Sequence, residues 1–228
     1  MTSTGNVRSH NEDAVLELPA AGLWVVADGM GGHNAGDVAS RMIIEALASV
    51  RERSPPSAFV DDVEDRLSAV NERLFAASLE SNAGMSGSTV AVLLAFGRHC
   101  LSLWAGDSRI YRWREGAMAQ ITRDHSEVQE MLDGGVPDAR QHGASNVITR
   151  AVGGSRELFL DIELRELRNN DRYLLCSDGL YREISEADMA HHLTGNDPEG
   201  ACRALLKQAL AGACSDNVSA IAVQFNGL

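Results

Sequence analysis

The sequence predicts an α+β protein, a four-layer αββα sandwich in which two antiparallel sheets are flanked by helix pairs. Two observations support this fold class. Strand-like segments follow one another in runs, joined by turn signals such as Glu115-Gly116, and helical segments occur as neighbours in the chain. Runs of strands and paired helices favour antiparallel sheets covered by helices over alternating βαβ units.

The first predicted helix pair lies on either side of the turn-forming segment Ser54-Pro55-Pro56-Ser57. Apolar residues recur at helical spacing from Val38 to Val50 and again from Val60 to Leu74. A second pair is expected at Glu186–Leu193 and Pro198–Ala211. Each helix has one apolar face, which must cover a sheet to leave water.

The predicted strands are short segments rich in β-branched, aromatic and other apolar residues between turn signals. They are Asp13–Leu18, Leu23–Ala27, Ser88–Phe96, Cys100–Ala105, Arg109–Arg114, Ala117–Thr122, Asp161–Leu167, Tyr173–Cys176 and Val218–Phe225. The order of strands and helices along the chain therefore fits two sheets with helices outside.

The segment Met131–Asn146 follows neither period. It contains Gly134, Gly135, Pro137 and Gly143 among polar residues. Loops of this length in a compact domain are usually functional or disordered. We expect a mobile flap at residues 131–146 within a single domain that covers residues 1–228.

The composition is that of an ordinary globular domain, with 44% hydrophobic and 23% charged residues among 228. This length suffices for one sizeable domain and is short for two. The formal net charge of -12 disfavours nucleic acid and membrane surfaces as partners, because both are anionic. We also expect a monomer.

The cysteines indicate a reducing compartment. The four of them have no C-x-x-C spacing, which argues against a zinc site or a disulfide framework. No stretch approaches the roughly 18 apolar residues that cross a bilayer, and residues 1–11 lack the apolar core of a signal peptide. We therefore expect a cytoplasmic protein with reduced, mostly buried cysteines at Cys100, Cys176, Cys202 and Cys214.

Short acidic motifs follow or open the predicted strands. The apolar runs Leu23–Ala27 and Tyr173–Cys176 lead into Asp28 and Asp178, and a buried carboxylate must be paired, hydrogen-bonded or metal-bound. The motifs are Arg8-Ser9-His10-Asn11-Glu12-Asp13, Ala27-Asp28-Gly29-Met30-Gly31-Gly32-His33, Gly106-Asp107-Ser108-Arg109, Ser177-Asp178-Gly179 and Asp216-Asn217.

A simple alternative is that each Asp-Gly pair only forms a turn, since both residues are common there. Turn chemistry leaves unexplained why several apolar strands end in aspartate without a nearby counter-charge in the sequence. Oxygen ligands without His or Cys clusters indicate Mg²⁺ or Mn²⁺ rather than zinc.

Other kinds of site are excluded by their spacing. The glycine-rich segment at 29–36 lacks the Gly-Lys-Ser/Thr of a P-loop and the pattern of a dinucleotide fingerprint. The chain has no G-x-S-x-G elbow. The pair His191-His192 has no H-E-x-x-H spacing, and we interpret it as an exposed helix turn.

Taken in order, the motifs resemble those of the metal-dependent serine/threonine protein phosphatases (the PPM family, type 2C), in the form found in its bacterial branch. The resemblance extends from Arg8 to Ser219. It is carried by R-x-x-N-E-D, A-D-G-M-G-G-H-x-x-G, G-S-T, A-G-D-S-R, R-D-H-S, N-x-I-T-R-x-x-G, S-D-G-L and D-N-x-S.

The resemblance implies a metal centre that contains two Mn²⁺ or Mg²⁺ ions and a third one nearby. Asp28 would bridge the two ions, the Gly29 carbonyl would bind one of them, and Asp178 and Asp216 would complete the set. Asp107 would hold the third ion together with Asp178, next to the flap. The residues Glu12, Asp13 and Asn217 would orient ligands and metal-bound waters, Asn217 through its amide on Asp216.

The resemblance also assigns Arg8 to the substrate phosphate, which its planar fork suits. The eukaryotic relatives have a histidine directly after the Asp-Gly as proton donor, whereas this chain has Met30. His33 is the nearest alternative donor, and it could equally only solvate the start of a helix. We expect Gly87-Ser88-Thr89 to tie strand ends together, and Ser126 to cap a helix with no catalytic role for His125.

The predicted activity is hydrolysis of phosphoserine and phosphothreonine in proteins, by a water that bridges the two ions. The substrates would be those of a bacterial serine/threonine kinase. Two alternatives are weighed against it: a catalytically inactive phosphoprotein adaptor, which the complete aspartate set disfavours, and a hydrolase of small phosphomonoesters or nucleotides, which only an activity comparison excludes.

Overall fold

The structure, a computed structural model, describes residues 1–31, 35–52, 54–80, 86–136, 147–195 and 197–227. One of its two sheets contains β1 (Thr2–Ser3), β7 (Arg109–Arg114), β8 (Ala117–Gln120), β10 (Arg172–Cys176) and β11 (Val218–Gln224). The other contains β2 (Asp13–Leu18), β3 (Leu23–Met30), β4 (Gly87–Ser88), β5 (Val90–Phe96), β6 (His99–Ala105) and β9 (Asp161–Glu166). The strand orders are β1-β11-β10-β7-β8 and β2-β3-β5-β6-β9, with β4 beside β3.

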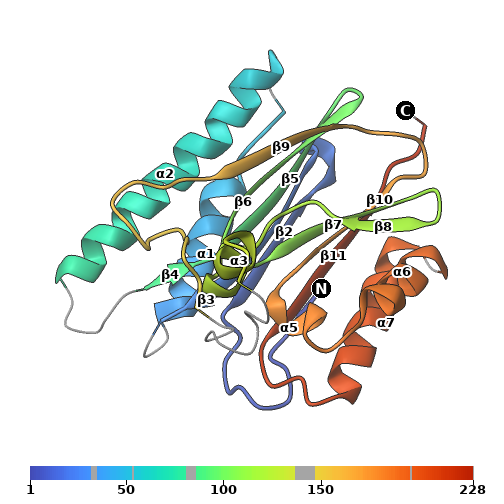
Figure 1. Cartoon of the computed structure of the whole chain (residues 1–228). Coiled ribbons are helices and arrows are strands. Elements are labelled where there is room, and N and C mark those ends of the chain that lie inside the picture. Colours follow the sequence, from blue (N-terminus) through green and yellow to red (C-terminus); the bar gives the residue numbers. More distant parts are fainter. Residues whose placement is uncertain (32–34, 53, 81–85, 137–146, 196, 228) are drawn as a thin grey trace.

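Every pairing between these strands is antiparallel. Figure 1 shows one helix pair on each outer face of the two stacked sheets. The helices are α1 (Ala35–Leu47), α2 (Pro56–Glu80), α3 (Glu127–Asp133), α5 (Asp178–Tyr181), α6 (Glu186–Gly195) and α7 (Pro198–Ala211), and a short 3-10 turn, η1, covers Pro19–Ala21. The predicted four-layer αββα sandwich is confirmed.

Three apolar layers hold the sandwich together. Phe59 of α2 and Leu103 of β6 belong to the layer between the first helix pair and its sheet. Tyr173 of β10 belongs to the layer between the two sheets, and Leu205 of α7 to the layer under α6 and α7. All four side chains are fully buried, so the alternating apolar faces that the sequence predicted do pack inward.

The strand boundaries differ from the prediction where the acidic motifs begin. β3 continues past Ala27 to Met30, because Asp28 lies opposite Asp13 of β2 and Gly29 lies opposite Ser88 of β4. The predicted strand Ser88–Phe96 is divided at Thr89. Asp28 is therefore a residue of the sheet itself, not of a turn after it.

The predicted flap is only partly loop. Helix α3 extends to Asp133, so the aperiodic segment starts at Gly134 instead of Met131. Ser126 caps this helix by accepting a hydrogen bond from the backbone N–H of Gln129 at 3.3 Å, as expected. Residues 137–146, the rest of the flap, lie outside the described residues.

The two ends of the chain meet, which the sequence did not predict. β1 pairs with β11, and the amino group of Met1 donates a hydrogen bond to the carbonyl of Ala220 at 2.7 Å. The N-terminal loop that carries Arg8 therefore lies beside the C-terminal motif that carries Asp216.

Two further expectations concern the environment of the protein. All four cysteines are free and buried, as predicted. Within the described ranges, no helix is both long and apolar enough to cross a membrane.

The helix-covered layer predicts a contrast between two phenylalanines. Phe59→Ala should lower the free energy of unfolding by about 3–5 kcal/mol, because it opens a cavity in a closed core. Phe159→Ala should change it by no more than about 0.5 kcal/mol, because Phe159 is 63% exposed. Denaturant unfolding of both variants measures this, and equal losses would contradict the assignment of the core.

Candidate active site

Five aspartates from separate segments lie at one end of the sandwich. Asp13 and Asp28 are paired residues of β2 and β3. The other three occupy the connection between β6 and β7, the first position of α5 and the residues before β11, and they are Asp107, Asp178 and Asp216. Burial raises the pKa of Asp28 well above its ordinary value, and repulsion from the other four carboxylates raises it further. The structure thus brings together the aspartates that the sequence singled out.

The backbone of Asp28 is held by the Gly87-Ser88-Thr89 motif. The N–H of Asp28 donates to the Thr89 hydroxyl at 3.1 Å. Its carbonyl accepts hydrogen bonds from the Ser88 hydroxyl at 3.0 Å and from the Thr89 N–H at 2.9 Å. The predicted structural role of this motif is confirmed, and it fixes the position of the central aspartate.

Two glycines allow helix α1 to approach β3 closely. A Cβ atom on Gly29 would lie 2.0 Å from the carbonyl oxygen of Gly36, and one on Gly36 would lie 2.6 Å from Oε1 of Glu12. The N–H of Gly29 also donates to the Glu12 carbonyl at 3.0 Å. Glycine is therefore required at both positions, and the close approach places Glu12 beside the aspartates.

Asp13 is held from one side only. Its Oδ2 accepts hydrogen bonds from the hydroxyls of Ser177 at 2.7 Å and Ser219 at 2.6 Å. Burial raises the pKa of Asp13 to about 6, while the two hydroxyls act in the opposite direction. These bonds join β2 to β11 and to the residue that follows β10 in the other sheet, so Asp13 also links the sheets.

Buried carboxylate oxygens without hydrogen-bond partners mark a place for cations. Of the five clustered aspartates, three have one buried oxygen without a hydrogen-bond partner in the described structure, and these are Asp13, Asp107 and Asp178. Leaving such an oxygen unpaired in the interior is costly, and a hard cation satisfies it. The oxygen-only donor set fits Mg²⁺ or Mn²⁺.

The protein supplies only part of such a coordination shell. Within the described ranges, no three His, Cys, Asp or Glu side chains form a group that could hold a metal by themselves. Magnesium-like ions keep several waters and need few protein ligands. The arrangement therefore fits ions that are held by single carboxylates, a carbonyl and water.

The raised pKa values of Asp178 and Asp107 also favour a cation at this site. Burial raises the pKa of Asp178 to about 7, and repulsion from Asp107 adds to this. Burial is also the main cause that raises the pKa of Asp107. Both carboxylates favour a neutral form or a nearby positive charge.

Arg8 lies at the site and contacts Asp216. Its guanidinium donates to Oδ2 of Asp216 at 2.9 Å, and the two side chains are 53% and 32% exposed. The hydrogen bond to Asp216 is the main cause that raises the pKa of Arg8. Because the guanidinium is exposed and lies beside the aspartates, an incoming phosphate can reach it. The predicted role of Arg8 requires this access.

The side-chain amide of Asn217 does not bind Asp216, so the role predicted for this side chain is wrong. The Asn217 backbone N–H, not the side-chain amide, donates to Oδ1 of Asp216 at 2.9 Å. The side-chain amide donates to the carbonyls of Thr4 and His10, both at 2.9 Å, and accepts from the N–H of Glu12 at 2.8 Å. Asn217 is buried among backbone groups of the N-terminal loop, and it therefore anchors the loop that carries Arg8.

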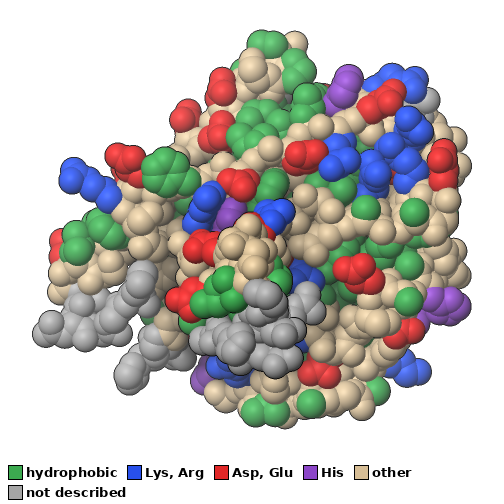
Figure 2. All heavy atoms as spheres, viewed as in Figure 1, with side chains coloured by type: hydrophobic (Ala, Val, Ile, Leu, Met, Phe, Trp, Pro, Cys, Tyr) green, Lys and Arg blue, Asp and Glu red, His purple; other side chains and the backbone are tan. Residues whose placement is uncertain are grey.

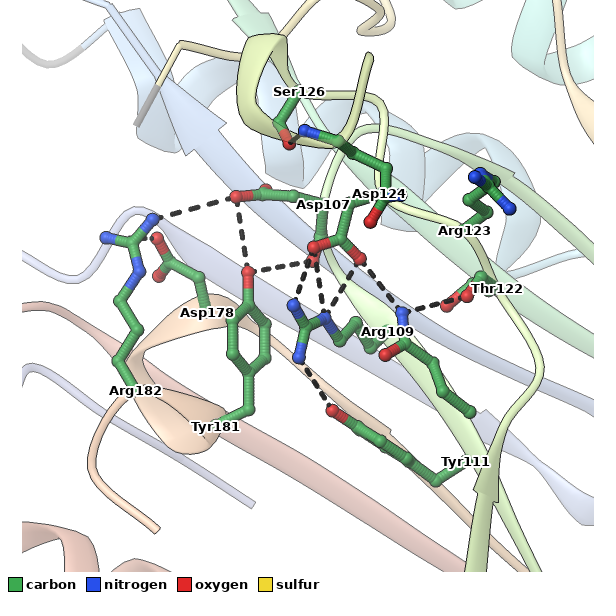
Figure 3. A network of polar contacts seen from close by, with 12 residues as sticks. Asp107, Arg109, Tyr111, Thr122, Arg123, Asp124, Ser126, Asp178, Tyr181 and Arg182 are labelled. Atoms are coloured by element: carbon green, nitrogen blue, oxygen red, sulfur yellow. Dashed lines mark hydrogen bonds and ion pairs between the residues drawn. The ribbon is translucent and has the colours of Figure 1, made fainter. Parts of the chain in front are cut away.

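The sequence did not predict the polar network around Asp107 (Figure 3). Arg109 binds Asp124 through two nitrogens, the closer at 2.6 Å, and its guanidinium lies 3.6 Å above the ring centre of Tyr181. Tyr181 donates to the carbonyl of Asp107 at 3.1 Å and also contacts Oδ2 at 3.3 Å. Arg109 and Asp124 belong to the A-G-D-S-R and R-D-H-S motifs, so the motifs did contain the signal.

Arg182 is the other residue that the sequence interpretation missed. Its guanidinium lies 2.8 Å from Oδ2 of Asp178 and 3.7 Å from Oδ2 of Asp107. The spacing of four residues between Asp178 and Arg182 was the available signal, because it places the two side chains on one helix face.

The two histidines in the motifs have different outcomes. His125 is buried, and its Nδ1 accepts a hydrogen bond from the N–H of Gly106 at 3.2 Å, which supports the turn before Asp107. Burial lowers the pKa of His125. His33, the candidate proton donor, lies outside the described residues.

The arginines at the opposite end of the sandwich have partners of their own. Figure 2 shows positively charged side chains gathered over the end of the molecule where β9 leads into β10. Arg165 pairs with Glu163 at 2.9 Å, and Arg168 lies within 4.0 Å of Glu115 and Glu166. Charge compensation near the five aspartates therefore depends on local groups.

Two cavities border the site. One of about 480 Å³ lies beside Met30 at the end of β3, and Arg150 and Phe159 also line it. The other, of about 280 Å³, lies between α3 and α5 and is lined by Asp107, Arg182 and residues of α3. Of the five aspartates, Asp107 lines the second cavity.

The sequence matches a family model described as protein phosphatase 2C over residues 2–210. The serine/threonine protein phosphatase PstP of Mycobacterium tuberculosis is 35% identical over 221 residues, which cover 95% of this chain. The chain spans 42% of the length of that relative.

Solved structures give the same match at the level of the fold. PppA, described as a key regulatory component of T6SS in Pseudomonas aeruginosa, is 40% identical with a TM-score of 0.92, covering 99% of this chain and 96% of that chain. The catalytic domain of the phosphatase PstP, solved with two manganese ions, is 34% identical with a TM-score of 0.88 and has the same coverage. At this identity the likeness covers both fold and sequence.

Raising the pH in the presence of a chelator should lower the melting temperature. Burial raises the folded-state pKa of Asp13 to about 6 and of Asp178 to about 7, so the folded protein binds more protons than the unfolded chain. The resulting stability is complete below the unfolded pKa values and is lost as the pH rises through the folded ones. Melting curves between about pH 5 and pH 8 measure this window.

The control is Asp178→Asn, which should show a smaller drop because one of the titrating groups is gone. Added Mn²⁺ should remove much of the drop in the parent protein, because a cation takes the place of the protons. The same pH dependence in parent and variant would contradict the crowding of these carboxylates.

Proposed function

The chain belongs to the protein phosphatase 2C family, and on that premise we propose that it is a metal-dependent phosphatase that removes phosphate from phosphoserine and phosphothreonine in proteins. The observation that carries this proposal is the convergence of five aspartates at one end of the sandwich, with partnerless buried oxygens on three of them. The names of the relatives, serine/threonine protein phosphatases, support the substrate class.

Asp28, Asp178, Asp216 and the Gly29 carbonyl would hold two Mn²⁺ or Mg²⁺ ions, and Asp107 with Asp178 a third. The solved relative with two manganese ions supports the first pair. When bound, a pair of divalent ions supplies an activated water for direct attack and neutralises the charge of the phosphoryl oxygens. A phosphoenzyme is not expected, because no Cys or Ser motif offers a nucleophile.

The chain's own residues keep the ligands in place. Asp28 is fixed through its backbone by Ser88 and Thr89. Asp13 is oriented by Ser177 and Ser219, and its other oxygen remains available to a metal-bound group. Rigid support of this kind keeps metal ligands in position before the substrate arrives.

Arg8 would bind the substrate phosphate. Its fork is half exposed, and its contact with Asp216 keeps it beside the ligands. A guanidinium can bind two phosphate oxygens at once, which both holds and orients the group. Anchoring of the N-terminal loop by Asn217 supports this position.

The proton for the leaving alkoxide needs a donor other than Met30, since a thioether carries no proton. His33 is the nearest candidate in the sequence. A water in the site is the other possible source, and the pH dependence of turnover in a His33→Ala variant separates the two.

The preference for protein substrates is supported by the names of the relatives, which are serine/threonine protein phosphatases. We propose that its substrates are proteins phosphorylated by a bacterial serine/threonine kinase. We also propose that it acts in the cytoplasm, a reducing compartment in which its free buried cysteines are stable. The flap, which starts after α3 at Gly134, would contact protein substrates, whereas small phosphate esters would not reach it.

Removing the charge of Asp28 should abolish turnover without unfolding the protein. Asp28→Asn keeps the volume of the side chain and takes away a charge that the ions need. The melting temperature in chelator should stay the same or rise, because the removed carboxylate is repelled by four others. Hydrolysis of a phosphothreonine peptide with and without Mn²⁺ measures the loss.

The parent protein must also lose activity in chelator and regain it with Mn²⁺ or Mg²⁺. Full turnover by metal-free protein would end the proposal. Faster hydrolysis of free nucleotides than of the phosphopeptide would favour a small-molecule phosphatase, and tight phosphopeptide binding without hydrolysis would favour an adaptor.

Truncating Arg8 should raise KM for phosphopeptides by about tenfold or more, with a smaller effect on kcat, because a charge-assisted bond to phosphate is lost in both ground and transition states. Arg203→Ala is the matched control, since Arg203 is an exposed arginine on α7. Steady-state kinetics decide the matter. An unchanged kcat/KM in Arg8→Ala would make Arg8 only a surface residue.

A further inference from the structure

Arg182 reaches toward both of the aspartates that would hold the third cation (Figure 3). Its Nη1 lies 2.8 Å from Oδ2 of Asp178, and its Nη2 lies 3.7 Å from Oδ2 of Asp107. Asp107 lies in the connection between β6 and β7, Asp178 is the first residue of α5, and the guanidinium lies within ion-pair distance of both. A cation between them would bind the same two carboxylates, on which Oδ1 of each has no hydrogen-bond partner.

The arginine is the exposed member of this group. Its side chain is 33% exposed, while the Asp107 side chain is 5% and the Asp178 side chain 12% exposed. Its backbone is fixed at the end of α5, where its N–H donates to the Asp178 carbonyl at 3.1 Å. The long side chain can therefore swing outward while its backbone stays in place.

A place for the displaced side chain exists. Arg182 lines the cavity of about 280 Å³ between α3 and α5, together with Ser126 and Gln129. These polar groups can solvate a guanidinium that has left the carboxylates. Movement of Arg182 into this space needs no change in the sheets.

Other arginines near the site have different partners. Arg109 is bound to Asp124 through two nitrogens and is packed on Tyr181. Arg8 is paired with Asp216. Among the described residues, Arg182 is thus the arginine with ion-pair contacts to Asp107 and Asp178.

We propose that Arg182 is a tethered cation that competes with the third divalent ion for Asp107 and Asp178. The proposal rests on the third ion of the proposed function. Arg182 keeps the two carboxylates compensated when the ion is absent, and the ion must displace it to bind. Two positive charges on the same pair of carboxylates repel each other strongly in a partly buried setting, so the two occupants exclude each other.

This competition has a consequence for metal dependence. A core ion shares only Asp178 with Arg182, whereas the third ion needs both of the carboxylates that Arg182 contacts. The third site therefore fills only at a higher metal concentration than the core. Arg182 sets that threshold.

The direct test counts bound Mn²⁺ without using activity. Free Mn²⁺ is measured by electron paramagnetic resonance during titration of the parent protein, Arg182→Gln and the control Arg203→Gln. Arg203 also forms an i,i+4 ion pair, with Glu199, and both members are about 70% exposed on α7. The weakest class of sites should bind Mn²⁺ at least about fivefold more tightly in Arg182→Gln than in the parent, which is the lower end of typical coupling between two binding events. Its affinity for Mn²⁺ should be unchanged in the control.

Asp107→Ala identifies the weak class. Both the single variant Asp107→Ala and its combination with Arg182→Gln should lose the weak class of sites, while the two tight sites remain. An unchanged or weaker third site in Arg182→Gln, or a parent protein with no third class of sites, overturns the proposal.

Melting curves distinguish competition from a merely structural ion pair. In chelator, Arg182→Gln should melt lower than the parent protein, because two buried carboxylates lose their partner. At high Mn²⁺ the difference should close, since the ion replaces the guanidinium. A difference in melting temperature that stays constant at all Mn²⁺ concentrations contradicts competition. The variant Arg182→Lys keeps the charge, so its melting temperature should stay closer to that of the parent.

Hydrolysis of a phosphothreonine peptide by the same parent sample separates this proposal from the proposed function. An active parent protein whose third site is indifferent to Arg182→Gln overturns only the role of Arg182. An inactive parent protein refutes the phosphatase assignment, and the Mn²⁺ titration still decides the competition.

Discussion

The organisation of the site follows from mutual repulsion between five aspartates that share one partly buried end of the sandwich. Burial and repulsion raise the pKa of Asp28 well above its ordinary value, and they raise those of Asp13 and Asp178 to about 6 and about 7. Such a cluster is tolerated only if protons, arginines, hydroxyls or metal ions compensate it. The surrounding polar residues can each be understood as part of that compensation. Ser177 and Ser219 bind one oxygen of Asp13, while Arg8 and Arg182 pair with aspartates at two edges of the cluster.

The fold supplies the frame that this repulsion requires. Asp13 and Asp28 are paired residues of adjacent strands, and the hydroxyls that hold Asp13 come from the other sheet. The ends of the chain are joined where β1 pairs with β11, and Asn217 binds the N-terminal loop. The site therefore depends on contacts between the first and last segments of the chain. We expect it to form only when both sheets are assembled.

The sequence predicted the layers and the aspartates well, because both leave strong local patterns. Apolar periodicity revealed α1, α2, α6 and α7, and aspartate after an apolar strand revealed Asp28 and Asp178. The contacts that depend on three-dimensional approach were harder to predict. No local pattern showed that the Asn217 amide would bind Thr4 and His10, or that Arg182 at the end of α5 would reach Asp107 in the β6–β7 connection. The short strand β1 was missed for the same reason, since two residues carry no period.

The most direct test of this account is a crystal structure with Mn²⁺, in which anomalous scattering locates each ion directly. The account predicts two strong anomalous peaks among Asp28, Asp178 and Asp216. It further predicts that a weaker third peak between Asp107 and Asp178 appears at high Mn²⁺ concentration, with Arg182 moved away from both carboxylates. Peaks elsewhere on the protein, or no peaks beside Asp28 at saturating Mn²⁺, would contradict the claim that the aspartate cluster is a metal centre.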